Sequence, residues 1–458
     1  MNTIIVLTFT GIIVLLLGIS TKKHLLVSVI SVLLLAAIGV VFLDPIISTE
    51  RLLPMLSSDS LSNSFTVLML VLALFIFFIA DHYFLRRQKT VEDVYSVMIF
   101  SLIGAVILTM FNNMVMFFIG LEIMSVSLYI LTGSKKNSSR SNEASMKYFL
   151  MGTFSTSVML FGIALIYGAS GSFDLTAIGN YTVANKENLP LFFKAGLILL
   201  TVAMSFKIAA APFHFWTPDV YHGAPTLITT YMATIVKIAG VIAFYRLYVH
   251  SFAAVEDLWT DLLAFLAVPT ILIGNLGAIY QTRVKRMLAY SSIAHSGYIM
   301  LALISVDYNS FTSIFYYLMA YSIASIGSFI ALMLVTEVTK DGSVSTFNGL
   351  AKKNPLISLL VTLSLFSLAG LPPLAGFMAK YFIFIRTIET GYLWLAIIAI
   401  IGSAISIVYY FKIVVAMYLG ESKDIVIPLT NLSKVLMAII AILIVLLGIF
   451  PEQIISLL

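Results

Sequence analysis

The chain has 458 residues, of which 60% are hydrophobic and 10% are charged, and its mean hydropathy is +1.06. Soluble domains carry roughly 25% charged residues, so this chain cannot cover a water-facing surface, and the lipid bilayer must be its solvent. It contains no cysteine, which excludes disulfides, thiolate metal sites and cysteine-bound iron–sulfur clusters within the chain. The modest net charge of +5 indicates loop lysines and arginines of a membrane protein, not a nucleic-acid-binding surface.

Apolar runs of about 20 residues follow one another along the chain, and each is long enough to cross a bilayer. The predicted fold class is therefore an all-α polytopic membrane protein. The first run is followed, not preceded, by Lys22 and Lys23, so we expect a retained span and not a signal peptide. Fourteen spans are predicted, at residues 3–20, 24–43, 64–82, 94–110, 112–131, 145–169, 191–212, 226–248, 259–281, 286–306, 310–336, 355–385, 391–418 and 434–456.

The orientation follows from the positive charges of the loops. One set of alternating loops carries sixteen lysines and arginines, whereas the other set carries five, namely Arg51, Lys186, Lys194, Arg246 and Arg386. The richer set is predicted to be cytoplasmic, which places both termini outside.

An internal repeat is weakly visible between YFLMGTFSTSVMLF (148–161) and YYLMAYSIASIGSF (316–329). The two segments are predicted to cross the membrane in opposite directions. Two later spans look broken at corresponding positions, at the prolines of 212–225 and in AGLPPLAGF. Inverted repeats with broken helices are typical of transporters. The predicted division is N-terminal helices 1–3 (1–93), a first inverted five-helix repeat (94–250), a second (251–420) and helix 14 (421–458).

Five ionisable residues lie at predicted membrane depth: Glu122, Lys207, Lys237, His295 and Lys380. Each charged group there costs about 2.5–3.5 kcal/mol on insertion scales. A paired structural ion is the alternative explanation for Glu122. However, three lysines and one deep acid cannot all be statically paired, which favours a functional role for the lysines.

Proton movement suits these residue types. Desolvation in general lowers the pKa of a lysine, and a nearby carboxylate raises it. Glu122 is the expected neighbour of Lys207, and moving it would release the proton of the lysine. His295 and His214 titrate nearest to neutral pH and could connect the lysines, with Tyr290 adding a hydroxyl.

The broken helices imply buried water, because Pro212 and Pro373 free carbonyls that water or a lysine can satisfy. Kinks that serve packing alone and a hydrogen-bonded core histidine at His214 remain alternatives. Lys147 either reaches the cytoplasmic surface or acts on Glu122 and Lys207 as a second cation. No phosphate loop, nucleotide fingerprint or metal-binding cluster stands out, so no redox chemistry is expected of this chain alone.

Three stretches resemble the antiporter-like membrane subunits of respiratory complex I: KIAAAPFHFWTPDVYHGAPTLITTYMATIVKIA, RVKRMLAYSSIAHSGYIML and LAGLPPLAGFMAKYF. The resemblance covers the whole chain in length, span number and orientation. Within the family it looks most like the subunit N group of bacterial NADH-quinone oxidoreductase. Subunit M usually has a glutamate where this chain has Lys380, and the long lateral C-terminal helix of subunit L is not seen after residue 456.

The resemblance implies a role for each matched position. It implies that Glu122 and Lys207 form the ion pair, that Lys237 connects the two halves, and that Lys380 is the terminal lysine on the second broken helix. The remaining matched residues of the proton path are His295, Tyr290, Lys147 and His214. The implied function is one proton channel of an enzyme that passes electrons from NADH to quinone.

Flavin and iron–sulfur clusters are then expected on partner subunits of the membrane and peripheral arms, and none in this chain. The implied location is the bacterial inner membrane. The alternative hypotheses are a subunit of a multi-subunit sodium/proton antiporter, the membrane arm of a hydrogenase, and a structural spacer. The buried lysines argue against the last.

Overall fold

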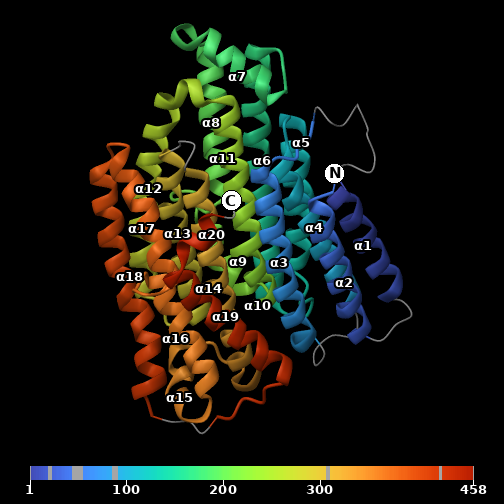
Figure 1. Cartoon of the computed structure of the whole chain (residues 1–458), viewed down its shortest axis with the longest axis vertical. Helices are drawn as coiled ribbons and strands as arrows, with labels where there is room; N and C mark the ends of the chain where they lie inside the picture. Colours follow the sequence, from blue (N-terminus) through green and yellow to red (C-terminus); the bar gives the residue numbers. More distant parts are fainter. Residues whose placement is uncertain are drawn as a thin grey trace. The chain divides into compact units, whose positions relative to one another are not determined.

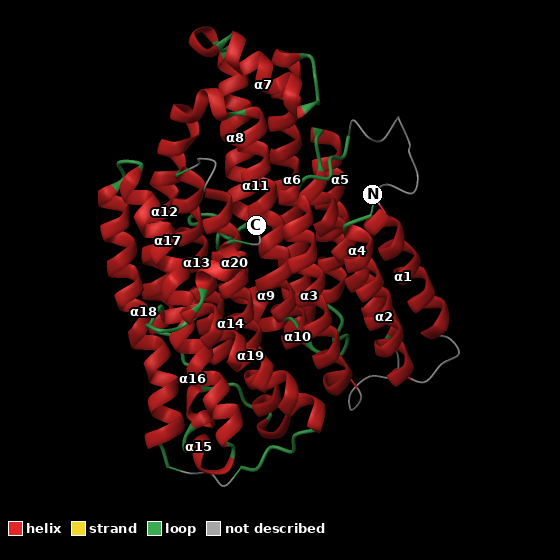
Figure 2. Ribbon diagram, viewed as in Figure 1, coloured by secondary structure: helices red, strands yellow, loops and turns green. Residues whose placement is uncertain are grey.

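The computed structural model describes residues 2–18, 23–43, 55–84, 91–305, 310–421 and 425–456. Six of the predicted loop cations lie outside these residues: Lys22, Arg51, Arg86, Arg87, Lys89 and Lys423. Within these ranges, Figure 2 shows helices joined by loops and no strand. The β-type pairing there is limited to isolated bridges, such as the one between Leu56 and Phe111.

Each of the fourteen predicted spans contains helical residues where it is described, which confirms the predicted all-α fold class. In the described part of the chain, ten helices are long and apolar enough to cross a membrane, and three more are shorter apolar helices. The α-helices are α1 Asn2–Gly18, α2 Lys23–Val41, α3 Ser60–Phe84, α4 Glu92–Met110, α5 Met114–Thr132, α6 Ser139–Ser170, α7 Leu175–Ala184, α8 Leu191–Lys207, α9 Trp216–Gly223, α10 Thr226–Tyr231, α11 Lys237–Ser251, α12 Glu256–Ile279, α13 Val284–Ile304, α14 Ser310–Thr339, α15 Leu350–Lys353, α16 Pro355–Ala369, α17 Ala375–Glu389, α18 Leu393–Leu419, α19 Asn431–Ile449 and α20 Pro451–Ile455.

The chain divides into two units, and each is built around its own tightly packed helices. The first contains Met1–Ala209 and Gly223–Leu262, and the second contains Ala210–His222 and Leu263–Leu458. This division differs in position from the predicted repeat boundary at residue 250.

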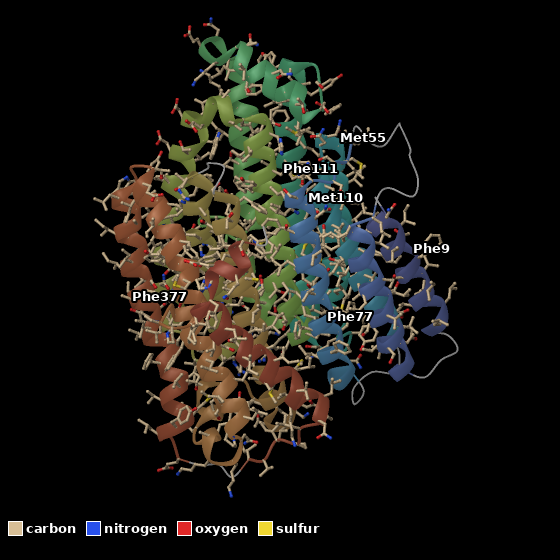
Figure 3. The ribbon with its side chains drawn as sticks, viewed as in Figure 1. Phe9, Met55, Phe77, Met110, Phe111 and Phe377 are labelled. Atoms are coloured by element: carbon tan, nitrogen blue, oxygen red, sulfur yellow. The ribbon has the colours of Figure 1, made fainter. Side chains whose placement is uncertain are left out.

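In the first unit, α1, α2 and α4 lie side by side (Figure 1), and α5 packs along α4. Phe77 of α3 sets its ring edge-on to Tyr95 of α4, with the ring centroids 5.6 Å apart (Figure 3). Glycines let two helix pairs approach closely, as small residues do in membranes. A Cβ on Gly104 would lie 2.5 Å from the carbonyl oxygen of Gly120, and one on Gly162 would lie 2.9 Å from that of Gly196. The second contact holds α6 against α8, and so fixes the neighbours of the Lys207 end of α8.

In the second unit, α14 packs against α13, α16, α17 and α19 and is buried on nearly every side. The loop after α14 is fastened by Asp341, whose carboxylate accepts hydrogen bonds from Ser343 and Thr346 and faces Arg283 at 3.5 Å. The hydroxyls of Ser343 and Thr346 hold the pKa of Asp341 below its usual value.

Exposed apolar side chains cover the helices that are least enclosed. In the apolar 18-residue stretches of α6, α18 and α19, only 39% of the residues are buried. Phe154, Ile400 and Ile442 are exposed on these helices. Phe9 likewise lies exposed on the outer side of α1 (Figure 3). Side chains of this kind suit contact with lipid or with apolar partner subunits.

The first break begins earlier than the sequence predicts. Residues 191–212 were expected to form one span, but α8 ends at Lys207, before Pro212 is reached. Ala209 has a left-handed backbone (φ 62°), and a short helix, α9, follows the break. The second break lies between Ala369 and Ala375, as predicted. A further helix that the span prediction did not contain, α7, is capped by the side chain of Asp174.

Arg246 corrects the loop count used for the orientation. It was counted as a loop cation, yet it lies on α11 and its side chain is only 1% exposed. Its Nη1 donates to Asp59 at 2.7 Å, its Nε donates to the carbonyl of Phe111 at 2.6 Å, and its Nη2 donates to Ser57. The guanidinium therefore ties α11 to the start of α3 and the end of α4.

Replacing Arg246 with Met should destabilise the first unit by about 2–3 kcal/mol, since it removes hydrogen bonds to a charged group and leaves their acceptors unpaired. Arg386→Met is the matched control, because Arg386 forms a surface pair with Glu389 and such pairs contribute about 0–1 kcal/mol. Thermal unfolding of both variants in detergent measures the difference. Equal unfolding temperatures would contradict the structural role of Arg246.

Candidate functional site

Glu122 and Lys207 come close in the first unit, but each is held by a hydroxyl. The Nζ of Lys207 donates to the Oγ of Ser125 at 3.2 Å, and the hydroxyl of Thr156 donates to the Oε1 of Glu122 at 2.9 Å. Among the described residues, no ion pair joins the carboxylate of Glu122 to the ammonium of Lys207. Ser125 lies one turn after Glu122 on α5, so the two residues share a helix face.

The position of Lys207 at the end of its helix favours a cation. It is the last residue of α8, where the carbonyl groups lack intrahelical partners and the helix dipole is negative. The break after Lys207 therefore places this lysine at the negative end of its helix dipole.

Lys237 is also placed at a helix irregularity. A π-helical turn, Met232–Val236, separates α10 from α11, and Lys237 is the first residue of α11. Its side chain is 5% exposed. Single π-turns inside α-helices occur frequently at functional sites.

In the second unit the ammonium of Lys380 contacts neutral groups, and no carboxylate of a described residue is among its hydrogen-bond partners. Its Nζ donates to the carbonyl of Ala369 at 2.8 Å and to the hydroxyl of Ser403 at 2.9 Å, and it lies 5.1 Å from the ring centroid of Tyr298. A carbonyl oxygen, a hydroxyl oxygen and an aromatic face can each interact favourably with an ammonium group.

Proline creates the acceptor for Lys380. In a continuous helix the carbonyl of Ala369 would bond to the N–H four residues later, but residue 373 is a proline and has no N–H. Lys380, from the helix after the break, supplies the missing donor. The expectation that a lysine could satisfy a carbonyl freed by Pro373 is thus confirmed in the geometry.

The ring of Tyr298 is held in place from its hydroxyl end. The Nδ2 of Asn275 donates to the hydroxyl of Tyr298 at 3.0 Å, and the Oδ1 of Asn275 accepts from Tyr409 at 3.1 Å. Both groups of the amide are used, so α12, α13 and α18 are joined around the ring that faces Lys380.

His295 and Lys380 line one small cavity in the second unit. Tyr317, Tyr321 and Ser367 complete its polar lining, and it offers about 10 Å³ of space to the centre of a water molecule. That volume admits about one water. The Nδ1 of His295 is 2.6 Å from the hydroxyl of Tyr317. A water here would connect an imidazole, a phenol and an ammonium.

The other three predicted residues are not brought into these clusters. Lys147 is 42% exposed and pairs with Glu143, one turn earlier on α6, at 2.7 Å. Tyr290 is half-buried against Gly277 of α12, away from His295. His214 is buried with its ring beside Phe215, and its Nδ1 makes no hydrogen bond to any described residue. The satisfied core histidine considered for His214 therefore does not fit at that nitrogen.

Several polar neighbours were missed by the sequence reasoning. Ser125 could have been found from its spacing to Glu122, and Tyr317 and Tyr321 from their four-residue spacing in an apolar run. Thr156 and Ser403 gave no such signal, because their roles depend on which faces of separate helices meet. In the described part of the chain, no group of three or more His, Cys, Asp or Glu side chains could hold a metal ion.

Comparison with known proteins identifies the family of this chain. Residues 112–406, more than half of the chain, match the NADH:quinone oxidoreductase/Mrp antiporter transmembrane family. The chain belongs to this family. The matched region contains all eight predicted site residues and both helix breaks.

Members of the family resemble the chain over its whole length. NADH-quinone oxidoreductase subunit N of Cytophaga hutchinsonii is 40% identical over 453 residues, covering 99% of this chain and 98% of that protein. A chain of respiratory complex I from Thermus thermophilus with bound aureothin is 28% identical, with a TM-score of 0.80, covering 99% of this chain and 98% of that one. A chain of the Mrp complex from Dietzia sp. DQ12-45-1b has a TM-score of 0.85 at 19% identity, over 100% and 96% of the two chains, which shows the fold alone.

Gly370→Ala should impair proton transfer because it disturbs Lys380. Gly370 has φ 85°, and an added Cβ would lie 2.8 Å from the Cδ of Lys380. Gly391→Ala is the matched control, since Gly391 has φ 89° and no atom within 4 Å of the added Cβ. Both changes strain the backbone by about 1–2 kcal/mol.

Quinone-linked proton uptake in membrane vesicles should fall in Gly370→Ala and persist in Gly391→Ala, with similar losses of thermal stability. If both variants lose uptake equally, backbone strain and not Lys380 explains the result.

Proposed function

We propose that this chain is a proton-translocating membrane subunit of NADH-quinone oxidoreductase. It couples electron transfer from NADH to quinone, on other subunits, to proton pumping through its buried lysines, Glu122 and His295. The observation that carries the proposal is the placement of Lys207, Lys237 and Lys380. Each is largely enclosed and lies at or beside a helix irregularity where polar groups can solvate an ammonium.

Static structural ions explain this placement less well. A buried charge is retained most simply when it is paired, and even a buried ion pair can often be replaced by apolar residues without loss of stability. Here Lys380 has no carboxylate partner among its contacts, and Lys207 contacts a hydroxyl in place of the carboxylate nearby. Deprotonation of Lys380 would therefore leave no carboxylate among its contacts without a counter-charge.

The remaining path residues are proposed with distinct roles. His295 with Tyr317 and the small cavity would pass protons toward Lys380. His214, with its free Nδ1, would accept a hydrogen bond from water near the first break. Lys147 would modulate Glu122 from the surface end of α6, and Tyr290 would add a hydroxyl from α13. The two inverted repeats, 94–250 and 251–420, are part of the same proposal.

An external driving reaction is required. Moving one proton against 100 mV costs about 2.3 kcal/mol, and this chain has no redox centre to supply it. Flavin and iron–sulfur clusters would lie on partner subunits, as the resemblance to respiratory complex I implies. We place the chain in the bacterial inner membrane with both termini periplasmic. Because the chain has no cysteine, a single Glu187→Cys variant tests this topology, and it should react with an impermeant maleimide from the outside.

Lys207→Met should lower proton pumping and quinone reduction together by about tenfold, which corresponds to 1.4 kcal/mol on the barrier. Lys194→Met is the control, since it removes a lysine from the other end of the same helix. Both activities are measured in vesicles, with assembly checked on native gels. Normal pumping by an assembled Lys207→Met complex would refute the carrier role.

A second candidate is a subunit of a multi-subunit sodium/proton antiporter or of a membrane-bound hydrogenase. The family itself spans quinone oxidoreductases and Mrp antiporters, and one fold serves both. Co-purification separates the candidates. A tagged chain extracted in mild detergent should bring flavin and iron–sulfur absorbance with it. A colourless assembly of small membrane subunits would favour the antiporter, and a nickel-containing partner would favour the hydrogenase.

A further inference from the structure

Two hydroxyls separate the charges of the first unit, and they come from two different helices. Ser125 of α5 is 2% exposed and accepts from Lys207, whereas Thr156 of α6 is 8% exposed and donates to Glu122. Each charged group therefore keeps a hydrogen bond although the carboxylate and the ammonium do not touch.

The hydroxyl of Thr156 has an alternative acceptor. It lies 2.9 Å from the Oε1 of Glu122 and 3.1 Å from the carbonyl of Gly152, one turn earlier on α6. A hydroxyl carries one proton, so it can serve either acceptor. When Glu122 moves away, Thr156 can keep a bond to Gly152, and the departure of the carboxylate leaves no buried donor unsatisfied.

Ser125 differs from the other serine and from the threonine of its helix. Ser127 and Thr132 each donate to the carbonyl four residues earlier, at 2.8 Å and 2.7 Å. Ser125 instead turns its oxygen to Lys207. Since Ser125 is one turn from Glu122 on the same face of α5, Lys207 has two acceptors within reach of one flexible side chain, one neutral and one charged.

We propose that Ser125 and Thr156 are positioning residues that stabilise an open arrangement of Glu122 and Lys207. In the open arrangement Lys207 bonds to Ser125 and Glu122 bonds to Thr156. In the closed arrangement the two charges bond directly and Thr156 turns to Gly152. The hydroxyls bring the two arrangements closer in free energy, so that the pair opens readily during turnover. This inference rests on the proposed function, because it assigns the opening of the pair to the pumping cycle.

Thr156→Val and Thr156→Ser provide the decisive comparison. Valine keeps the shape of threonine and loses the hydroxyl, whereas serine keeps the hydroxyl and leaves a small void. If the hydroxyl positions Glu122, proton pumping by the assembled complex should fall about tenfold in Thr156→Val, the size expected for one hydrogen bond to a charged group, and stay near wild type in Thr156→Ser. A role in packing alone predicts the opposite order, and that order would overturn the proposal.

Ser125→Ala tests the other hydroxyl against Ser127→Ala, which removes a hydroxyl two residues away that bonds only to its own helix. Pumping should fall about tenfold in Ser125→Ala and remain in Ser127→Ala. Equal activity of the two variants would overturn the proposal.

Lys207→Met in the same vesicles distinguishes failure of the proposed function from failure of the hydroxyl proposal. Loss of pumping in Lys207→Met with full activity in Thr156→Val and Ser125→Ala would leave the proposed function standing and reject the hydroxyl positioning.

Discussion

A lysine ammonium among apolar helices must be solvated by the protein itself, and this constraint explains where the helices of this chain break. An intact helix offers no free carbonyl, because each one bonds to an N–H four residues later. Ending a helix exposes carbonyls and the negative end of its dipole. Lys207 is placed at such an end by its own helix, and Lys380 reaches the end of the preceding helix at Ala369. Each lysine thus lies beside the end of a helix, but Lys380 bonds to a carbonyl there and Lys207 bonds to the hydroxyl of Ser125.

The two units differ in what stands beside the cation. Lys207 has a carboxylate within one helical turn of its hydroxyl partner, so a movement of Glu122 changes its surroundings strongly. Lys380 has a carbonyl, a hydroxyl and an aromatic ring, all of them neutral. Its surroundings are tightly fixed, with Asn275 holding the tyrosine ring, and a single-water cavity is the variable element. On the proposed function, the first unit responds to charge movement and the second to hydration.

The sequence predicts the parts of this arrangement that depend on composition and local spacing. Apolar length predicts a helix in each of the fourteen spans, and the prolines of AGLPPLAGF predict the second break at the observed place. The early end of α8 could not be read from Pro212, because it depends on the left-handed turn at Ala209. Arg246 looked like a loop residue, since its distance in sequence from Asp59 hides the pairing. The contact of Lys147 with Glu143 follows a four-residue spacing that was open to prediction. Thr156 and Ser403 depend on the register between helices, which no local pattern encodes.

A fold that is shared at low sequence identity does not by itself identify the driving reaction. The chain superposes as well on a subunit of an Mrp complex as on one of respiratory complex I, although the first is only 19% identical to it. In this chain, broken helices and nearby hydroxyls solvate the buried cations, and that geometry does not depend on the energy source. The driving reaction has to act on a side chain that can move at a small cost in free energy. Glu122, held by one shared hydroxyl, fits that requirement better than Lys380, which has three fixed partners. On the proposed function, we therefore expect a partner subunit to act on the first unit.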